Sequence, residues 1–173
     1  MPITQMVLNN YISDNFIETG TATGGTSLNA LQIGFKEIWT VEKCDDRIKI
    51  CENKFKDKKN IHFYAGDSRK FLKNILQYIN GSVTFWLDAH TNSWSPLLEE
   101  LAIIKENMEI VPIILIDDVS LFGAYKIKKK DVKKRLLNIC PDYQISYENG
   151  KRNKGKKRKN DIMVAQIRRK DER

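Results

Sequence analysis

Short apolar runs alternate with longer amphipathic runs along the first two thirds of the chain. The apolar runs are four to six residues long and rich in β-branched and aromatic side chains, as is typical of buried strands. The runs between them repeat apolar residues at helical spacing and therefore predict helices. The predicted strands cover residues 15–18, 37–42, 61–65, 83–87 and 112–116, and the predicted helices cover residues 26–33, 44–55, 68–79 and 96–108. Continuous apolar strands separated by helices favour a parallel sheet that is covered on both faces.

The last third of the chain has a different pattern. A helix is predicted at residues 132–139, followed by strands at 143–147 and 161–167. Residues 149–160 between these strands are rich in Gly, Asn, Lys and Arg, so the two strands predict an antiparallel hairpin with a long basic loop. The predicted fold class is therefore α/β, with a Rossmann-like, doubly wound, mostly parallel sheet and a C-terminal antiparallel hairpin.

The composition of the chain limits the classes of protein to which this fold can belong. The chain has 173 residues, of which 41% are hydrophobic, which is enough for one domain with a buried core. No apolar run approaches the roughly 20 residues of a membrane span, and the first residues do not resemble a secretion signal, so no membrane partner is expected. Cys44, Cys51 and Cys140 include no C-x-x-C pair, which argues against a disulfide framework and a structural zinc site. A reducing, cytoplasmic location is the expectation that follows.

The formal net charge of +8 is concentrated in two short runs. Residues 126–135 carry seven basic residues and one acidic residue, and residues 151–159 carry seven basic residues and no acidic one. The rest of the chain has 16 basic and 21 acidic residues, a net charge of −5. Because the body is mildly acidic, the charge of the whole chain is weak evidence for nucleic-acid binding.

A glycine-rich turn follows the first predicted strand. Gly20 and Gly24 lie directly before a predicted helix, and glycines at the carboxyl end of a strand let the backbone turn tightly and approach a ligand. Their spacing excludes the dinucleotide fingerprint, and the G-K-[ST] sequence of phosphate-binding loops is absent. Glu42 ends the second strand 22 positions after Gly20, where an acid can accept hydrogen bonds from both ribose hydroxyls of a nucleoside. The alternatives are a purely structural turn and a helix-dipole role for Glu42.

Three carboxylates follow the next two strands. Asp88 comes directly after the fourth strand, and Asp117 and Asp118 come directly after the fifth. Adjacent parallel strands would bring these side chains to one edge of the sheet, where they repel one another unless a cation or protons compensate. Oxygen ligands suit Mg²⁺, Mn²⁺ or Ca²⁺. His90 lies two residues after Asp88 and can serve as a general base, a cofactor contact or a metal ligand, whereas helix capping is the alternative for the Asp117–Asp118 pair.

Together these residues resemble the class I S-adenosylmethionine-dependent methyltransferases, above all the small metal-dependent O-methyltransferases of the catechol, caffeoyl-CoA and macrolide-sugar types. Their first motif, E-x-G-x-x-x-G-x-[ST], matches residues 18–26, and the acid after their second strand matches Glu42. Their Gly-x-Ser after the third strand matches residues 66–68, and their metal-binding Asp and Asp-Asp match Asp88 and residues 117–118. The likeness covers about residues 14–120 by motif and the final hairpin by pattern.

The resemblance implies a set of functional residues. The implied binding residues for S-adenosylmethionine are Glu18, Gly20, Thr21, Thr23, Gly24, Thr26, Ser27, Glu42, Lys43, Asp67, Ser68, Asp88 and His90. The implied ligands of Mg²⁺, or of Mn²⁺ or Ca²⁺, are Asp88, Asp117 and Asp118, and the implied catalytic residues are Asp88 and His90. The catechol-type enzymes carry a catalytic lysine where this chain has Thr91, so His90 is our candidate proton acceptor. For Asp67, capping of the next helix is an equal alternative to contact with the adenine ring.

The resemblance also implies an organisation and a reaction. We expect a single methyltransferase-like domain over residues 1–173, with an N-terminal helix in 1–13, a cofactor and metal core in 14–120, and a helix and basic hairpin in 121–173. The implied reaction is O-methylation of a hydroxyl on a sugar, diol or phenol, which can be phosphorylated or acidic. The alternatives are an RNA or nucleotide methyltransferase recruited by the basic runs, and a non-catalytic nucleoside-binding module. The N-terminal segment that usually builds the acceptor pocket is short here, so the resemblance implies that part of the pocket comes from a partner subunit of a homo-oligomer or is open to a large acceptor.

Overall fold

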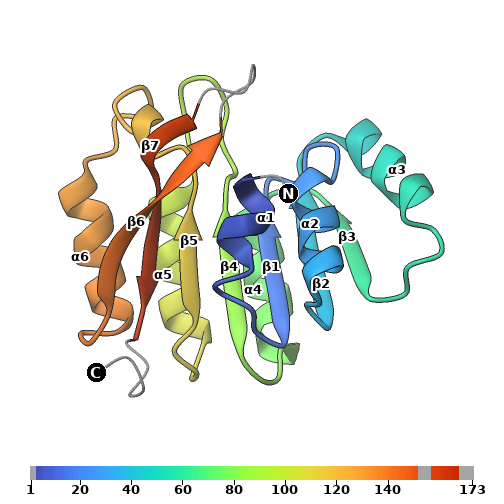
Figure 1. Ribbon diagram of the computed structural model, residues 1–173, viewed down its shortest axis with the longest axis horizontal. Coiled ribbons are helices and arrows are strands. Elements are labelled where there is room, and N and C mark those ends of the chain that lie inside the picture. The colour runs from blue at the N-terminus through green and yellow to red at the C-terminus, as the bar shows by residue number, and fades with distance from the viewer. Residues whose placement is uncertain (1–2, 152–156, 168–173) are drawn as a thin grey trace.

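A seven-stranded sheet forms the centre of the protein (Figure 1). The computed structural model describes residues 3–151 and 157–167. The strands are β1 (Asn15–Thr19), β2 (Glu37–Glu42), β3 (Ile61–Ala65), β4 (Val83–Leu87), β5 (Ile113–Ile116), β6 (Gln144–Lys151) and β7 (Lys157–Gln166). Their order in the sheet is β3-β2-β1-β4-β5-β7-β6. The first five strands are parallel, and β7 is antiparallel to both β5 and β6, so the predicted doubly wound sheet with its C-terminal hairpin is confirmed.

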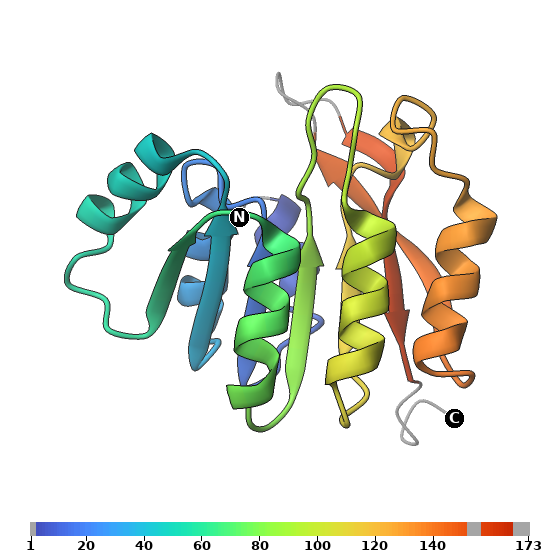
Figure 2. The ribbon, with the colours of Figure 1, turned by 180° about the vertical axis from the view of Figure 1, so that it is seen from behind.

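Helices cover both faces of this sheet. They are α1 (Ile3–Leu8), α2 (Gly25–Ile33), α3 (Asp45–Lys54), α4 (Ser68–Ile75), α5 (Leu97–Asn107) and α6 (Lys129–Ile139), with short 3₁₀ turns η1 (Leu76–Tyr78) and η2 (Val119–Leu121). The helices α1 to α3 lie on the face seen in Figure 1, and α4 to α6 lie on the face seen in Figure 2. Among the described residues, no helix has the length and apolar character needed to cross a membrane.

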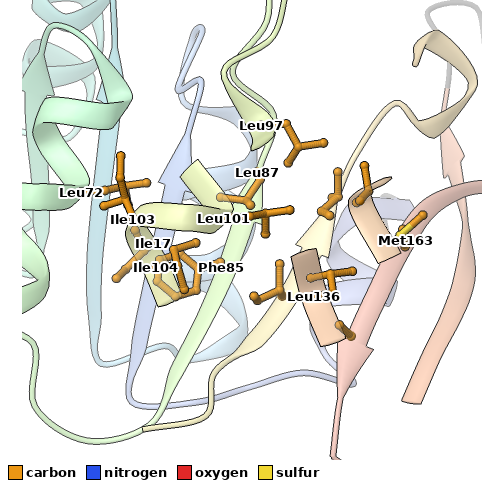
Figure 3. Packing of buried hydrophobic residues seen from close by; sticks show 14 of the residues in the cluster. Ile17, Leu72, Phe85, Leu87, Leu97, Leu101, Ile103, Ile104, Leu136 and Met163 are labelled. Carbon is orange, nitrogen blue, oxygen red and sulfur yellow. The ribbon is translucent and has the colours of Figure 1, made fainter. Parts of the chain in front are cut away.

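The central strands are buried on both sides because their successive side chains point to opposite faces. On β4, Phe85 packs toward α4 to α6, whereas Trp86 packs toward α1 to α3. On β1, Ile17 and Phe16 divide in the same way, and both are fully buried. Figure 3 shows the layer that contains Ile17 and Phe85, packed against residues of α4, α5 and α6. This double burial explains why these strands read as continuous apolar runs in the sequence.

The main differences from the prediction lie outside the central strands. The helix predicted at 68–79 ends at residue 75 and continues as η1, and α6 begins three residues earlier than predicted. Part of the predicted loop at 149–160 is paired strand, since Gly150 pairs with Arg158 and Lys151 pairs with Lys157 beyond a bulge after Glu148. Backbone pairing at the edge of a sheet does not need apolar side chains, so the sequence pattern did not predict this extension. Residues 152–156 of that loop lie outside the described residues.

The loops that follow all five parallel strands meet at one edge, at the top of Figure 1. This edge is called the carboxyl edge below. The antiparallel strand β7 begins at the same edge, because its residue Met163 pairs with Ile116 at the end of β5. Ligands of open α/β sheets bind beyond this edge, so it is the first place to look for a functional site.

Candidate functional site

A cavity of about 470 Å³ opens at the carboxyl edge, beside the ends of β1 to β4. That volume suits a nucleoside-sized ligand. The lining residues come from four loops and are Gly20, Ala22, Val41, Glu42, Lys43, Cys44, Arg47, Gly66, Asp67, Ser68, Asp88, Ala89, His90, Thr91, Trp94 and Pro96. Seven of the residues predicted to bind the cofactor are therefore in the lining: Gly20, Glu42, Lys43, Asp67, Ser68, Asp88 and His90.

Gly20 allows the ends of β1 and β4 to approach each other at the floor of this cavity. Its φ of +91° is unfavourable for a residue with a side chain. A Cβ atom at this position would lie 2.5 Å from the carbonyl oxygen of Asp88, which is too close for any real contact. The close approach therefore requires glycine, as the sequence analysis inferred from its position after the first strand.

Glu42 is held in place by backbone donors. Its two carboxylate oxygens accept hydrogen bonds from the N–H of Ala22 at 2.9 Å and from the N–H of Cys44 at 3.0 Å. The Arg47 guanidinium lies 3.5 Å from the same carboxylate. Each oxygen keeps further acceptor capacity, so an oriented acid that lines the cavity is available to the hydroxyls of a ligand.

Three of the predicted cofactor residues form a buried network beneath the glycine turn instead of lining the cavity. The hydroxyls of Ser27 and Thr40 donate to one oxygen of Glu18 at 2.5 and 2.7 Å, and the Thr21 hydroxyl lies 2.5 Å from that of Thr40. Glu18 is 1% exposed, and its burial raises the pKa of the carboxyl from 4.5 to about 7. In this structure these side chains connect β1, β2 and the start of α2, and so support the turn from below.

The remaining predicted cofactor residues of the turn also lie outside the cavity lining. Gly24 has a φ of +74°, and a Cβ atom there would lie 2.8 Å from the Phe55 ring, so it allows α3 to pack closely. The carbonyl oxygen of Thr23 accepts a hydrogen bond from Lys54, and Thr26 is half-buried in the first turn of α2. The two glycines of the motif therefore have different roles: Gly24 allows helix packing, and Gly20 lies at the floor of the cavity.

We expect Glu18→Gln to gain stability relative to the unchanged protein as the pH rises from 5 to 8. The folded protein holds a proton on Glu18 up to about pH 7, whereas the unfolded chain releases it near 4.5, so rising pH removes stability over that interval. Glutamine keeps the shape and the acceptor oxygen but has no charge to bury. The difference in the free energy of unfolding should change by up to about 3 kcal/mol, measured by urea denaturation at both pH values. The control is Glu106→Gln, which makes the same change at an exposed position. If the free energy of unfolding of the two variants depended on pH in the same way, the burial of a titrating Glu18 would be contradicted.

Asp67 has both of the roles that the sequence left open, because it caps α4 and also lines the cavity. Its carboxylate accepts from the backbone N–H of Arg69 at 2.8 Å, and from the Arg69 guanidinium at 3.0 and 2.6 Å. These contacts lower the pKa of Asp67 to about 2. Arg69 in turn lies 5.2 Å from the ring of Trp94, which comes from the loop after β4 and also lines the cavity. Trp94 was not among the predicted site residues, because nothing local in the sequence indicates that its loop folds back over α4.

A cluster of two carboxylates and one imidazole adjoins the cavity. His90 Nε2 lies 3.2 Å from Asp88 Oδ1 and 3.3 Å from Asp118 Oδ2, and these three residues offer ligand atoms that all lie within 4.8 Å of one another. The two carboxylates raise the pKa of His90 to about 10, and the ring stacks on Tyr125 with centroids 5.1 Å apart. Burial raises the pKa of Asp88. The expected convergence of the strand-end carboxylates is thus present for Asp88 and Asp118.

Asp117, the other predicted metal ligand, lies beside this cluster and is not among its members. One of its oxygens accepts a hydrogen bond from the N–H of Asp118 at 2.8 Å. The side chain lines a small cavity of about 10 Å³, room for one water molecule, together with Glu100 and Tyr125. Burial raises the pKa of Asp117 well above its usual value, and the nearby Asp88 raises it further. The structure therefore groups His90 with Asp88 and Asp118, where the resemblance implied Asp117.

Arg158 connects the C-terminal hairpin to this cluster. Its Nη1 atom donates to Asp118 Oδ1 at 3.0 Å, to Asp161 Oδ2 at 3.1 Å and to the Ser120 hydroxyl at 2.6 Å. Asp161 is 2% exposed, so the guanidinium is held by a buried anion of its own strand. Sequence reasoning counted Arg158 only as part of a basic run, because its contact with Asp118 depends on the antiparallel pairing of β7.

Solved structures of methyltransferases share this fold. The O-methyltransferase from Bacillus cereus in complex with SAH has a TM-score of 0.70 at 13% sequence identity, over 95% of this chain and 79% of that chain. TomG from Streptomyces achromogenes, an O-methyltransferase of tomaymycin synthesis in complex with SAM, has a TM-score of 0.71 at 13% identity, over 95% and 77% of the two chains. The N-methyltransferase NodS from Bradyrhizobium japonicum WM9 has a TM-score of 0.56 at 12% identity, over 94% and 89%.

No protein-family model and no curated protein sequence matches the chain. The predicted resemblance to S-adenosylmethionine-dependent methyltransferases is confirmed at the level of the fold. Because the same fold carries methyl transfer to oxygen in two of these proteins and to nitrogen in the third, it does not identify the acceptor.

Proposed function

We propose that the protein is an S-adenosylmethionine-dependent methyltransferase that methylates a hydroxyl group with the help of a divalent cation. The observation that carries this proposal is the position of Asp88. It lines the cavity beside Gly20 and Glu42, and it also belongs to the cluster with His90 and Asp118. A ligand in the cavity and a group at the cluster are therefore neighbours, as transfer between them requires.

The cavity residues suit the methyl donor. The oriented carboxylate of Glu42 is placed for the ribose hydroxyls, and Asp67 and Ser68 lie beyond it at the end of β3, on the side expected for adenine. Gly20 leaves room for the backbone to approach the ligand. S-adenosylmethionine, when bound, supplies a methyl group on a sulfonium, which is electrophilic without help from the protein. The residues of the chain then have to position the acceptor and receive its proton.

The cluster suits a divalent cation. Asp88 Oδ1 is buried and accepts no hydrogen bond of good geometry from the described residues, although the His90 ring lies 3.2 Å away. Two carboxylates and an imidazole are a donor set that Mg²⁺ or Mn²⁺ accepts. A cation held there lowers the pKa of a bound hydroxyl. Asp88, Asp118 and His90 would hold it, while Asp117 supports the neighbouring Asp118 backbone.

The surroundings of His90 change its proposed role. With a pKa near 10 the imidazole keeps its proton at neutral pH while it lies between two carboxylates. Without a cation in the cluster, the protonated ring neutralises and orients Asp88 and Asp118; a cation held there would displace this proton, and Nε2 would then be one of its ligands. The side chains of Asp118 and Asp88 are 29% and 28% exposed, but only Asp88 lines the donor cavity, so Asp118 is the carboxylate left for an incoming hydroxyl to reach. We therefore assign His90 to holding the cluster and its cation, and Asp118 to contact with the acceptor hydroxyl.

Calorimetry tests the donor and the cation separately. We expect S-adenosylmethionine and S-adenosylhomocysteine to bind in the micromolar range, as is usual for substrates of enzymes. We expect Mn²⁺ to bind in a separate titration, and binding to be lost when Asp118 is changed. Absence of binding by both nucleosides would contradict the proposal, and nucleoside binding without cation binding would contradict its metal part.

We expect Arg158→Gln to bind Mn²⁺ about threefold to tenfold more tightly than the unchanged protein. The Arg158 guanidinium is a cation 3.0 Å from Asp118, so it competes with any other cation for that carboxylate. Glutamine keeps a donor for Asp161 and Ser120 and removes the charge. The affinity is measured by calorimetry, with Lys159→Gln as the control because Lys159 is the exposed neighbour on the same strand. Equal or weaker binding by Arg158→Gln would show that the guanidinium does not occupy the cation's place.

A further inference from the structure

Described residues from both basic runs of the chain lie at the carboxyl edge, beside the candidate site; residues 152–156 lie outside the described part of the chain. The run 126–135 begins in the loop after β5 and continues into α6, whose first residue is Lys129. The run 151–159 joins β6 to β7, and the backbones of Lys151 and Lys157 pair at the end of the hairpin. Because β7 begins where β5 ends, this end of the hairpin lies at the same edge as the loop after β5 (Figure 1). Described residues of two runs that are separate in the sequence therefore lie at one edge of the sheet.

The lysines of this surface are exposed and lack carboxylate partners. Lys126, Lys128, Lys129, Lys130 and Lys159 are exposed, and we call them the basic edge. Among the described residues none of them forms a salt bridge, a property that they share with most other lysines of the chain, so what distinguishes them is their close spacing at one edge. Like charges held together in this way repel one another unless an anion lies across them. The residues outside the two basic runs have a net charge of −5, so the excess positive charge of the chain is concentrated in these runs.

Space beside the cluster also favours a large acceptor. The cavity that adjoins Asp117 and Tyr125 has a volume of only about 10 Å³, which is too small for a sugar or a phenol. The 470 Å³ cavity is the one assigned to the methyl donor. Neither of these cavities offers a sugar or a phenol a place beside Asp118, and we expect the acceptor hydroxyl to approach from the open side of the carboxyl edge, where the basic edge lies. A small acceptor would leave most of these lysines without a function in binding.

We propose that the acceptor is RNA, whose phosphates bind the basic edge and whose ribose hydroxyl is presented to Asp118. This inference rests on the proposed function and names its substrate class. RNA combines a regular row of phosphates with a hydroxyl on every sugar, so one polymer matches both the charge of the surface and the chemistry of the site. DNA has the same charge but no 2′-hydroxyl. The binding is expected to be electrostatic, because the basic edge contains no aromatic residue for base stacking.

The binding test compares two variants of equal charge. In Lys128→Glu/Lys129→Glu/Lys130→Glu the changes lie on the basic edge; in Lys59→Glu/Lys73→Glu/Lys105→Glu they lie on exposed residues near the opposite edge. Binding of a fluorescent 20-nucleotide single-stranded RNA is measured by anisotropy at several salt concentrations. We expect the affinity of the first variant to fall at least tenfold. The slope of log affinity against log salt concentration should fall in magnitude by about 2, as for three lost phosphate contacts. The affinity of the second variant should stay within threefold of that of the unchanged protein. An equal loss in both variants would mean that only net charge matters, and would overturn the proposal.

The transfer test separates the acceptor from the rest of the proposed function. Label from methyl-tritiated S-adenosylmethionine should enter the RNA and not a DNA of the same sequence with both ends phosphorylated. Label in the DNA, or no label in any of a set of RNAs while calorimetry still shows nucleoside and Mn²⁺ binding, would overturn the assignment of RNA and leave the methyltransferase proposal standing. Binding to phosphatidylglycerol vesicles without binding to RNA would overturn it as well. Loss of nucleoside binding itself would instead contradict the proposed function.

Discussion

Asp118→Asn is expected to lower kcat/KM by about 100-fold and to weaken Mn²⁺ binding by at least tenfold. The change removes the charge of a carboxylate that takes part in the cluster with Asp88 and His90 and is the reachable partner of the acceptor hydroxyl. Asparagine has the same shape, and it tolerates the left-handed backbone of this position, where φ is +54°, better than other replacements. The fold should therefore be retained.

Two measurements make the Asp118 prediction specific. Affinity for S-adenosylhomocysteine should stay within threefold, because Asp118 is not in the lining of the donor cavity. The exposed-site variant Asp57→Asn, with the same chemical change, should match the unchanged protein in every assay. Unaltered turnover and unaltered Mn²⁺ affinity in Asp118→Asn would remove the basis for placing a cation at this cluster.

Gly20→Ala is expected to reduce affinity for S-adenosylhomocysteine by more than 100-fold. A methyl group at this position would lie 2.5 Å from the Asp88 carbonyl oxygen, and the backbone has a φ of +91°, so either β1 and β4 separate at their ends or the turn adopts another path. Both responses deform the floor of the cavity. Strain of this kind costs on the order of 1–3 kcal/mol in stability before the clash is counted, so the melting temperature should fall as well.

Gly25→Ala is the matched control for this change. Gly25 lies five residues further along, in the first turn of α2, where a Cβ atom would meet no other atom within 4 Å. Alanine is favoured over glycine inside a helix, so this variant should bind the nucleoside normally and be slightly more stable. If Gly20→Ala bound S-adenosylhomocysteine as well as Gly25→Ala does, the floor of the donor site would have to lie elsewhere.

The sequence predicted the features that depend on local pattern or on general rules of the fold. The central strands were predictable because burial on both faces makes them apolar throughout, as on β4 with Phe85 and Trp86. The meeting of Asp88 with Asp118 followed from the rule that adjacent parallel strands end at one edge. The position of Glu42 in the cavity lining followed from the same rule.

Other features depend on contacts that no local pattern reports. Asp118 joins the cluster with a left-handed backbone and Asp117 does not join it, and two identical residues in a row give no sign of this difference. Glu18 belongs to a sequence motif that resembles a cofactor site, yet its partners Ser27 and Thr40 enclose it in the interior. Arg158 reaches Asp118 only because β7 pairs antiparallel with β5, forty residues later in the chain.

The two hydrophobic layers share the same strands, and this has a consequence for how the protein loses its structure. On β7, Met163 belongs to one layer and Val164 to the other, just as Ile17 and Phe16 do on β1. Neither layer can melt while the other remains intact, because each would expose one side of strands that the other still needs. Heat and denaturant should therefore unfold the sheet and its C-terminal hairpin in a single two-state transition, with no partly folded species that retains the ligand cavity.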